Sequence, residues 1–261
     1  MALNPATLLR QLGPPVVVLV AILAIWEFLV GSTGTQFLLP PPSAIAGALA
    51  ENGPELFAAA RHTMLEAMGG LLLGTFAGVV TALVVARWSI AGRALLPLAI
   101  AASAIPTIAL APIANVWFGS TNVLSKMSVV AVVVFFPVLI NVVRGLRQVD
   151  PLSLELMHSY AATEVQVYET VRIPNALPYL MTALRISATL ALITAIIAEY
   201  FGGPRLALGV WVLDRARRFR FDEAWAAITI AALLGVGLYL ILTILEQRLI
   251  PWYSSVQATD E

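Results

Sequence analysis

The chain has 261 residues, of which 60% are hydrophobic and 11% are charged, and its mean hydropathy is +0.90. A soluble core of this size cannot bury so large an apolar fraction, so the composition indicates an integral membrane protein without a separate soluble domain. The 15 basic and 15 acidic side chains balance, so the chain has no net charge that would attract nucleic acid. The lack of cysteine excludes disulfides, thiol catalysis and cysteine-only metal sites. Two histidines are too few for a metal site made of histidine alone.

Apolar runs of membrane-spanning length recur along the chain, since about 20 helical residues cross a hydrocarbon core of about 30 Å. The first run follows Arg10 and carries Trp26 and Glu27 near its end. It is too long for the core of a signal peptide, and the Gly-Ser-Thr-Gly sequence at 31–34 is a poor cleavage site, so we interpret it as a membrane helix. In all, the sequence predicts six spans, at about residues 14–31, 66–86, 94–118, 124–143, 176–201 and 224–247.

A short surface helix is expected between the first two spans. Three prolines at 40–42 forbid a helix interior at that point, because a proline ring clashes with the preceding turn. Ser43 is well placed to cap a new helix, since its hydroxyl can accept a hydrogen bond from a free backbone N–H. The sequence therefore predicts an amphipathic helix over about 44–60 at the membrane surface.

Two spans have features of helices with close neighbours or a polar path beside them. Gly70, Gly74 and Gly78 place small residues along one face of the second span, which predicts close contact with another helix. The third span, 94–118, holds three prolines, and the carbonyls that they free are tolerated in a membrane only beside protein or a water-filled path. We therefore expect it to line the translocation path. The polar residues expected along that path are Thr107, Asn115, Asn141, Ser187 and Thr194.

Charged residues stand near both ends of the fifth span. Arg185 and Glu199 are 14 positions apart, roughly 21 Å along a helix, so they cannot pair with each other. We expect Arg185 to extend to the cytoplasmic interface. Glu199 is expected at the outer end, paired with an arginine of the last loop, either as an outer gate or as a plain structural ion pair. The arginines within 205–220 are interpreted either as a site for a binding protein or an anionic solute, or as charges neutralised by neighbouring acids.

The Lys/Arg bias of short loops predicts the orientation in the membrane. With a cytoplasmic N-terminus, eight arginines fall inside and two cations outside once the arginine-rich loop at 202–223 is set aside. We therefore expect both termini in the cytoplasm of a bacterium with this chain in the inner membrane. The expected organisation is a cytoplasmic N-terminus at 1–13, a single transmembrane domain at 14–250 and a cytoplasmic tail at 251–261.

A polar segment between the fourth and fifth spans is too long and too regular for a simple connection. Asp150 and Pro151 form a good helix start, because aspartate caps the first turn and proline lacks only an N–H that would be unpaired there. Apolar residues recur at helical spacing, which predicts an amphipathic helix over about 151–171, ended by Pro174 and Pro178. Its polar face is acidic, whereas a helix resting on anionic headgroups would carry Lys and Arg. Docking to a protein is therefore favoured over lipid binding.

Several motifs together resemble one family of transporters. Glu155, Ala161 and Val-Arg-Ile-Pro at 171–174 follow the spacing of the coupling loop of bacterial ABC importer permeases, which reads E-A-A, three residues, G, nine residues, I-x-L-P. The runs Ile-Pro-Thr-Ile-Ala-Leu-Ala-Pro at 105–112 and Phe-Pro-Val-Leu-Ile-Asn at 136–141 are similar to the nitrate, sulfonate and taurine type, whose branches include carriers of thiamine-precursor pyrimidines and riboflavin. The chain departs from the pattern with Leu-Met after Glu155 and alanine at 161, which favours a more continuous helix.

This resemblance implies an all-α, six-span permease of the type I ABC importer fold with a cytoplasmic coupling helix. It implies as partners a second copy of the chain, two ATP-binding cassette ATPases, an extracytoplasmic solute-binding protein and the lipid bilayer. ATP and magnesium are expected on the ATPase, because the chain has no phosphate-binding loop and its one lysine, Lys126, follows Ser125 instead of glycine. No cofactor and no catalytic residue are expected on this chain. The implied ATPase-coupling residues are Glu155, Tyr160, Ala161, Glu164, Val167, Tyr168 and Pro174.

Two other functional classes compete with this interpretation. An ion-coupled secondary transporter would normally need charged residues at mid-membrane, and between 67 and 143 Lys126 is the only charge outside the expected loops. An intramembrane enzyme would need a nucleophile, zinc or paired-aspartate motif, and none is present. The predicted function is therefore import of a small organic or anionic nutrient, such as a sulfonate, a nitrate-like anion, a pyrimidine or a vitamin precursor. The sequence does not distinguish these solutes, nor a homodimer from a heterodimer of permeases.

Overall fold

The computed structural model describes residues 5–33, 38–87, 97–104 and 106–250, and every regular element in these ranges is helical. An all-helical chain suits a membrane, because each backbone N–H and C=O pairs within its own segment. The helices are α1 (Pro5–Thr33), α2 (Pro42–Glu51), α3 (Gly53–Arg87), α5 (Leu110–Phe118), α6 (Val123–Arg147), α7 (Pro151–Ser159), α8 (Glu164–Val167), α9 (Ile173–Tyr200), α10 (Leu208–Arg217) and α11 (Phe221–Leu249), with a 3-10 turn η2 (Thr107–Ala109) and a π-helical turn η3 (Tyr168–Arg172).

Within the described residues, five segments are long and apolar enough to cross a membrane. These segments are Gly13–Val30, Gly53–Arg87, Val123–Arg147, Glu164–Tyr200 and Phe221–Leu249. The expected third span, 94–118, lies partly outside the described residues, which omit 94–96 and 105. Its described part consists of a helix at 97–103, then η2, then α5, and Pro106 stands at the break, where a proline ring disfavours a continuous helix.

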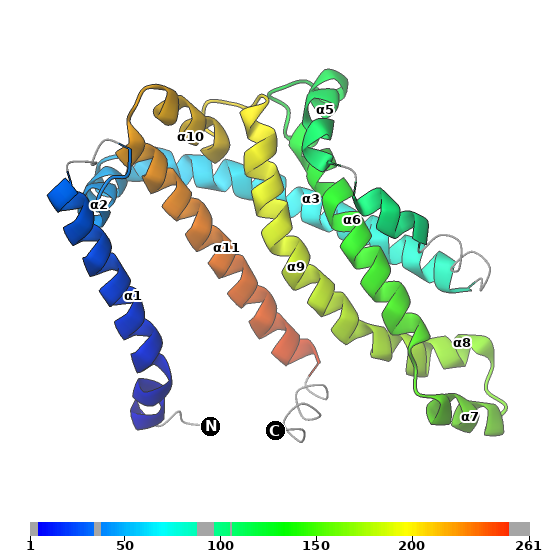
Figure 1. Cartoon of the computed structure of the whole chain (residues 1–261). Coiled ribbons are helices and arrows are strands. Elements are labelled where there is room, and N and C mark those ends of the chain that lie inside the picture. Colours follow the sequence, from blue (N-terminus) through cyan, green and yellow to red (C-terminus); the bar gives the residue numbers. More distant parts are fainter. Residues whose placement is uncertain (1–4, 34–37, 88–96, 105, 251–261) are drawn as a thin grey trace.

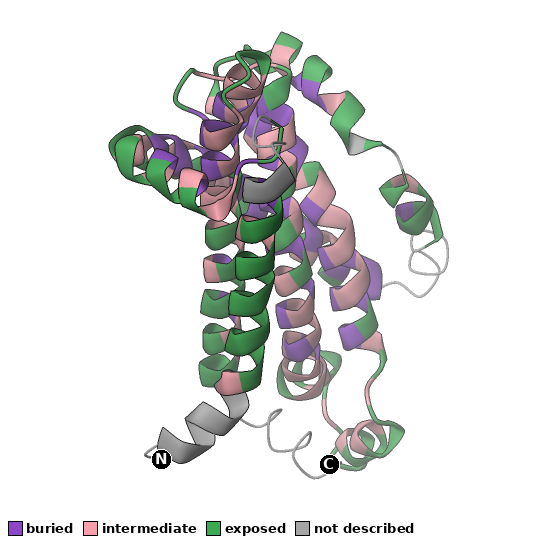
Figure 2. Ribbon diagram, turned by 60° about the vertical axis from the view of Figure 1, so that its left-hand side comes forward, coloured by how far each residue is buried: buried purple, intermediate pink, exposed green. Residues whose placement is uncertain are grey.

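Figure 1 shows how these elements are arranged. The helices α11, α9 and α6 run side by side, and α3 crosses behind them. At one end of the molecule lie α2, α10 and α5, and at the other end lie α7 and α8, toward which α1 begins and α11 ends. Figure 2 shows that α1 is exposed around most of its surface, and its exposed side chains include the apolar run from Val16 to Val20. Apolar helix surface of this kind is expected against lipid or another membrane helix.

The core lies where α3, α6 and α9 pack together. Gly70, Gly74 and Gly78 bring the backbones of α3 and α6 together, which confirms the predicted contact face. A methyl group on Gly74 would lie 2.5 Å from the Ala131 carbonyl oxygen and 2.8 Å from Val134 Cβ, so the fit leaves no room for a side chain. Valines of α6 and small residues of α9 fill the remaining space: Val130, Val134, Val138, Val142, Ala183, Ala188, Ala191 and Ala195.

The surface helix expected over 44–60 is two separate pieces. Asn52 separates α2 from α3, and α3 continues without interruption to the other end of the molecule. Ser43 is not the N-cap, because Pro41 holds that position and Ser43 lies in the first turn. The Ser43 N–H and hydroxyl donate to the carboxylate of Glu27 on α1, at 3.0 and 2.6 Å. A carboxylate at a helix N-terminus satisfies free donors and suits the helix dipole, so the cap comes from another helix.

The helix expected over 151–171 is also divided, by a turn at Ala161. The Ala161 N–H donates to the His158 carbonyl at 2.9 Å, and the Ala162 N–H donates to the Met157 carbonyl at 3.0 Å. These two bonds form the helix ending that usually has glycine at its left-handed position, and Ala161 adopts that conformation with φ of +52°. The expectation of a more continuous helix was wrong, because the hydrogen bonds hold the turn even without glycine.

The prolines after this turn do not end the helix that follows it. Thr163 and Gln166 form a reciprocal capping box that starts α8, and the chain is then helical to the end of α9. Pro174 lies in the first turn of α9, directly after the π-helical turn η3, and Pro178 is buried inside α9. A π turn changes the local backbone spacing, so it accommodates a proline ring without a break. The polar loop and the membrane helix α9 are therefore one mechanical unit.

Candidate functional site

The loop made of α7, the Ala161 turn and α8 projects from the lower end of the molecule in Figure 1. Four of its predicted coupling residues, Glu155, Tyr160, Ala161 and Glu164, are exposed, and Tyr160 is 76% exposed. Leu152, Leu156 and Val165 are exposed as well. Large apolar side chains within a polar-rimmed surface are typical of a protein contact.

Three of the predicted coupling residues join the loop to the bundle. Glu164 forms an ion pair with Arg87 at the end of α3. Val167 and Tyr168 are half-buried and line a cavity of about 380 Å³ between the loop and the ends of α3 and α6. The guanidinium of Arg172 stacks over the Tyr168 ring, 5.0 Å from its centroid. The inner side of the loop is therefore packed on its own chain, and the outer side is free.

The start of α9 is bonded directly to the end of α6. The Asn175 amide donates to the carbonyls of Gly145 at 2.7 Å and Gln148 at 3.0 Å, and Arg172 donates to the Leu146 carbonyl at 3.3 Å. Pro174 lies between Arg172 and Asn175 in the sequence and is half-buried. A force applied to the loop is thus carried into α6 and α9 together, because both helices are joined at its base.

The predicted path residues do not gather in one cavity of the single chain. Asn115 donates to the Phe201 carbonyl at 3.1 Å, and Asn141 donates to the Pro137 carbonyl of its own helix at 2.8 Å. Ser187 is fully buried in α9, and Thr194 lines a cavity of about 40 Å³ enclosed by η2, α5, α6 and α9. Thr107 lies in η2. Asn115 and Asn141 are therefore hydrogen-bonded within the chain, whereas the Ser187 hydroxyl is buried without a hydrogen-bond partner among the described residues.

Glu199 is buried at the upper end of the molecule and does not pair with an arginine. Its carboxylate accepts the Thr63 hydroxyl of α3 at 2.7 Å and the Gly209 N–H of α10 at 2.6 Å. Thr63 in turn accepts the Leu208 N–H at 3.0 Å. The expectation of an arginine partner was wrong, because backbone and hydroxyl donors from two other helices reach this carboxylate first. Glu199 consequently ties α3, α9 and α10 together.

Three arginines of the last loop have acidic partners of their own. Arg215 pairs with Glu223 at 2.7 Å, Arg220 pairs with the same carboxylate, and Arg218 pairs with Asp214 at 3.1 Å. For these three arginines, neutralisation by neighbouring acids is the interpretation that the structure supports. Since Glu223 is buried beneath two guanidinium groups, this cluster stabilises the junction of α10 and α11.

Arg185 also has a partner that spacing along one helix did not predict. Its guanidinium lies 3.1 Å from the Glu246 carboxylate of α11, and both side chains are largely buried. Arg185 therefore finds a partner on another helix, and its extension to the cytoplasmic interface stays a prediction. The attraction between the two charges offsets part of the free energy that is lost when each is removed from water. The ion pair therefore joins α9 to α11.

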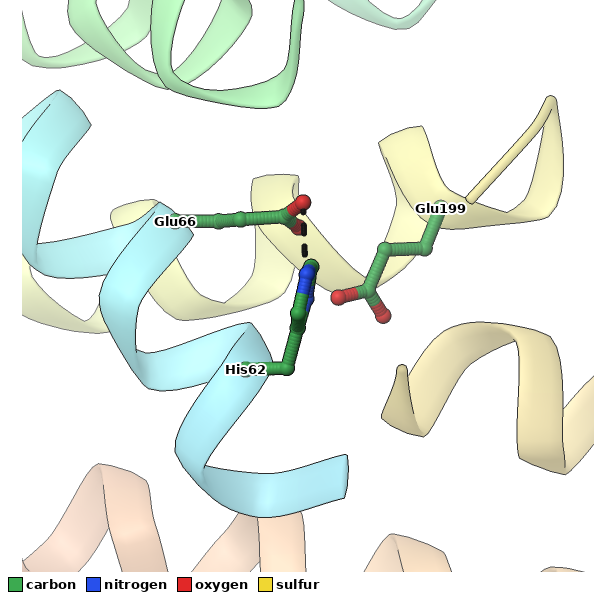
Figure 3. Close-up of side chains that lie close together, drawn as sticks. All are labelled: His62, Glu66 and Glu199. Carbon is green, nitrogen blue, oxygen red and sulfur yellow. Dashed lines mark ion pairs between the residues drawn. The ribbon is translucent and has the colours of Figure 1, made fainter. Parts of the chain in front are cut away.

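A polar cluster at the upper end contains residues that the sequence analysis missed. Figure 3 shows Glu66 and His62 of α3 directed toward Glu199 of α9. Glu66 is fully buried, and His62 Nδ1 lies 3.6 Å from its Oε1 atom. Lys126 of α6 is 1% exposed and donates to Asn115 Oδ1 at 3.0 Å, to Ser125 Oγ at 2.9 Å and to the Ser120 carbonyl.

A signal for this cluster was present in the sequence. His62 and Glu66 are four residues apart and so share a helix face. Ionisable groups inside a membrane helix are expensive and mark functional sites. They were overlooked because the charges of the expected spans were considered only from residue 67 onward, whereas α3 begins at Gly53 and places both side chains well inside the helix.

The match to a protein family decides between the remaining functional classes. Residues 70–254 match the family described as the binding-protein-dependent transport system inner membrane component. The chain belongs to this family. It is the permease subunit of an ABC importer, a multi-pass membrane protein without ATPase activity of its own, and its family works with a separate ATPase and a solute-binding protein. The ion-coupled transporter and the intramembrane enzyme are thereby excluded.

Individual relatives agree with this assignment. The permease is 32% identical to the formylaminopyrimidine transport permease protein ThiX of Halalkalibacterium halodurans, over 91% of this chain and 95% of that protein. It is 30% identical to the riboflavin transport system permease protein RibX of Chloroflexus aurantiacus, over 94% of this chain and 91% of that protein. Its fold is similar to a chain in the crystal structure of an amino acid ABC transporter, with a TM-score of 0.58 and 18% identity over 77% of this chain and 96% of that chain.

Proposed function

We propose that two copies of this permease form the translocation pathway of an importer in a bacterial inner membrane, with six spans in each copy. The α7–α8 loop is the coupling element, and it seats in a cleft of the ATPase, which binds ATP and magnesium. The observation that carries this proposal is the set of exposed apolar side chains, Leu152, Leu156, Tyr160 and Val165, on a loop tied to α3, α6 and α9. Both termini lie on the cytoplasmic side with this loop.

The proposed mechanism is a rigid-body movement of the helices. When the two ATPases close on ATP, they draw the two coupling loops together, and each loop moves with α9 because the chain is helical from Glu164 to Tyr200. The outer end of α9 then separates from α3 and α10, where Glu199 acts as the outer gate that holds the resting state closed. The differential affinity of the ATPase for the two states supplies the driving force.

For the solute, we propose a small organic nutrient of the nitrogen-heterocycle class. The support is the naming of two relatives that match nearly the whole chain, one for formylaminopyrimidine and one for riboflavin. The expected path residues Asn115, Asn141, Ser187 and Thr194 are small or uncharged, which suits a neutral solute whose recognition is left to the binding protein. This choice favours a pyrimidine or vitamin precursor over a nitrate-like anion or a sulfonate.

The coupling role is tested with Tyr160→Ala in the transporter complex reconstituted in proteoliposomes. Removal of an anchor from a buried interface typically costs about 2 kcal/mol or more, so uptake per ATP hydrolysed should fall at least about 10-fold while the permease stays in the membrane. Phe28→Ala is the matched control, because Phe28 and Tyr160 are both 76% exposed but Phe28 lies on α1. Equal uptake per ATP in wild type and Tyr160→Ala would refute the coupling role.

The solute class is tested separately with the purified binding protein of the same complex. Formylaminopyrimidine, riboflavin, taurine and nitrate are each titrated while the intrinsic fluorescence and the Tm of the binding protein are recorded. We expect saturable binding of a heterocycle and none of the two anions. Tight binding of taurine or nitrate with no response to either heterocycle would overturn the proposed solute class and leave the coupling role unaffected.

A further inference from the structure

Three polar side-chain atoms at the upper end of the bundle are buried without a hydrogen bond. Both carboxylate oxygens of Glu66 and the Nδ1 atom of His62 have no hydrogen-bond partner among the described residues, and the contact between the two side chains is an ion pair at 3.6 Å. Glu66 is fully buried, so bulk solvent does not reach its carboxyl group. Leaving a buried carboxyl group unsatisfied is costly, and a carboxylate in this position requires a cation or a proton.

The neighbouring polar groups are already engaged elsewhere. Glu199 accepts one hydrogen bond at each carboxylate oxygen, from Thr63 and from the Gly209 N–H. The Lys126 ammonium acts electrostatically on both carboxylates, but it donates to Asn115, Ser120 and Ser125. The Lys126 ammonium therefore donates no hydrogen bond to Glu66 or His62. A single proton shared between the two carboxylates would satisfy Glu66 and still leave the histidine nitrogen unpaired.

The geometry of the three side chains suits a single bound ion. One ligand atom each from His62, Glu66 and Glu199 lie within 4.8 Å of one another. The 3.6 Å separation of His62 Nδ1 and Glu66 Oε1 is too long for a hydrogen bond but close to the spacing of two ligands on one tetrahedral ion with bonds of about 2.0–2.2 Å. Figure 3 shows the three side chains converging from α3 and α9. The His62 side chain is 23% exposed, which leaves an entry route from solvent.

We propose that His62, Glu66 and Glu199 form a binding site for Zn²⁺ that bridges α3 and α9 at the outer end of the permease. One imidazole nitrogen and two carboxylates favour zinc, because Ca²⁺ and Mg²⁺ prefer ligand sets made of oxygen alone. The two carboxylates balance the charge of the ion, and water completes its coordination. Bound Zn²⁺ would hold the proposed outer gate closed; this consequence rests on the proposed function, whereas the binding does not.

The experiment measures metal binding to the intact transporter complex purified through a tag without histidine. Equilibrium dialysis against buffered Zn²⁺, followed by mass-spectrometric metal analysis, should give one Zn²⁺ per permease chain. X-ray absorption at the zinc edge should show one nitrogen and at least two oxygen ligands. His62→Gln and Glu66→Gln should each weaken binding by at least about 100-fold, more than the 10- to 100-fold typical of losing an outer-shell partner.

Matched controls separate this site from adventitious binding. His158→Gln removes the only other histidine of the chain, and Glu155→Gln removes an exposed glutamate of α7, and neither should change the affinity. Absence of Zn²⁺ at stoichiometry would overturn the proposal, as would equal losses in the control variants. A carboxyl infrared band that vanishes in Glu66→Gln, without zinc binding in the wild type, would assign a shared proton instead. If Glu66→Gln fails to fold, His62→Gln carries the test, because that side chain is partly exposed.

Discussion

Ala161 holds a backbone conformation that costs an alanine about 1–2 kcal/mol relative to the right-handed region. The strain persists because the Ala161 and Ala162 N–H groups close the end of α7 and because Thr163 starts α8 immediately afterwards. The turn directs α8 back toward the bundle, where Glu164 meets Arg87. The turn at Ala161 therefore determines which side of the loop faces the bundle and which side is exposed.

At this position, glycine should strengthen the turn and a β-branched residue should weaken it. We expect Ala161→Gly to stabilise the turn by about 1 kcal/mol, or about fivefold slower hydrogen exchange of the 161–162 amides, because glycine carries no Cβ penalty at positive φ. Ala161→Val should accelerate the same exchange. The measurement is hydrogen-exchange mass spectrometry on the purified permease, with α9 peptides as the internal control. Faster exchange in Ala161→Gly would contradict the strain.

The backbones of α3 and α6 approach each other closely along one face of each helix. The glycines at 70, 74 and 78 face the carbonyls of Met127, Ala131 and Phe135, so backbone meets backbone along three turns. Such contacts cannot yield as a flexible side chain would, because the helix backbone must shift as a whole. The α3–α6 pair is thus expected to move as one body when the loop and α9 move.

A methyl group added to this contact should be destabilising, although alanine is the better helix former. Gly74→Ala should lower the stability of the permease by about 1–3 kcal/mol through overpacking, recorded as a lower Tm in detergent. Gly237→Ala is the matched control, because Gly237 lies in the middle of α11 with nothing within 4 Å of an added Cβ, and it should leave the Tm unchanged or raise it. A Tm for Gly74→Ala at or above the wild-type value would disprove the close packing.

The two candidate functional features, the exposed loop and the buried polar cluster, lie at opposite ends of the molecule. The exposed loop lies at one end (Figure 1). Glu199 stands at the opposite end of α9, bonded to Gly209 of α10, with His62 and Glu66 directed toward it (Figure 3). Long, continuous helices join the two ends, above all the segment from Glu164 to Tyr200. Movement at the loop is therefore transmitted to the far end without a flexible joint in this segment.

This arrangement predicts opposite sidedness for the two ends. The chain has no cysteine, so Gln166→Cys and Arg217→Cys each introduce one thiol at an exposed position. In intact cells, a membrane-impermeant maleimide should label Arg217→Cys and leave Gln166→Cys unlabelled until the membrane is opened. Labelling of Gln166→Cys from the outside would reverse the orientation and remove the loop from the side on which ATP is available.

Local sequence features predicted much of this structure where the cause lies within a few residues. The apolar runs, the glycine face at 70–78 and the helix start at Asp150 follow from periodicity and capping, and the structure confirms the glycine contact and the Asp150 cap. The turn at Ala161 was not predicted, because alanine hides a left-handed position that glycine would reveal. The division of the third span was not predicted either. Its prolines indicated an irregular helix but did not show at which residue the helix would break.

Composition and short-range spacing were enough to predict a membrane protein, the motifs of an importer permease and a polar loop between two spans, because each of these features depends on residues close together in the sequence. The partners of Arg185 and Glu199 and the burial of Glu66 became visible in the folded chain. The Thr63–Glu199 bond joins residues 136 positions apart, and the acid facing Arg185 comes from another helix. Such pairings depend on how helices cross, which no local pattern specifies.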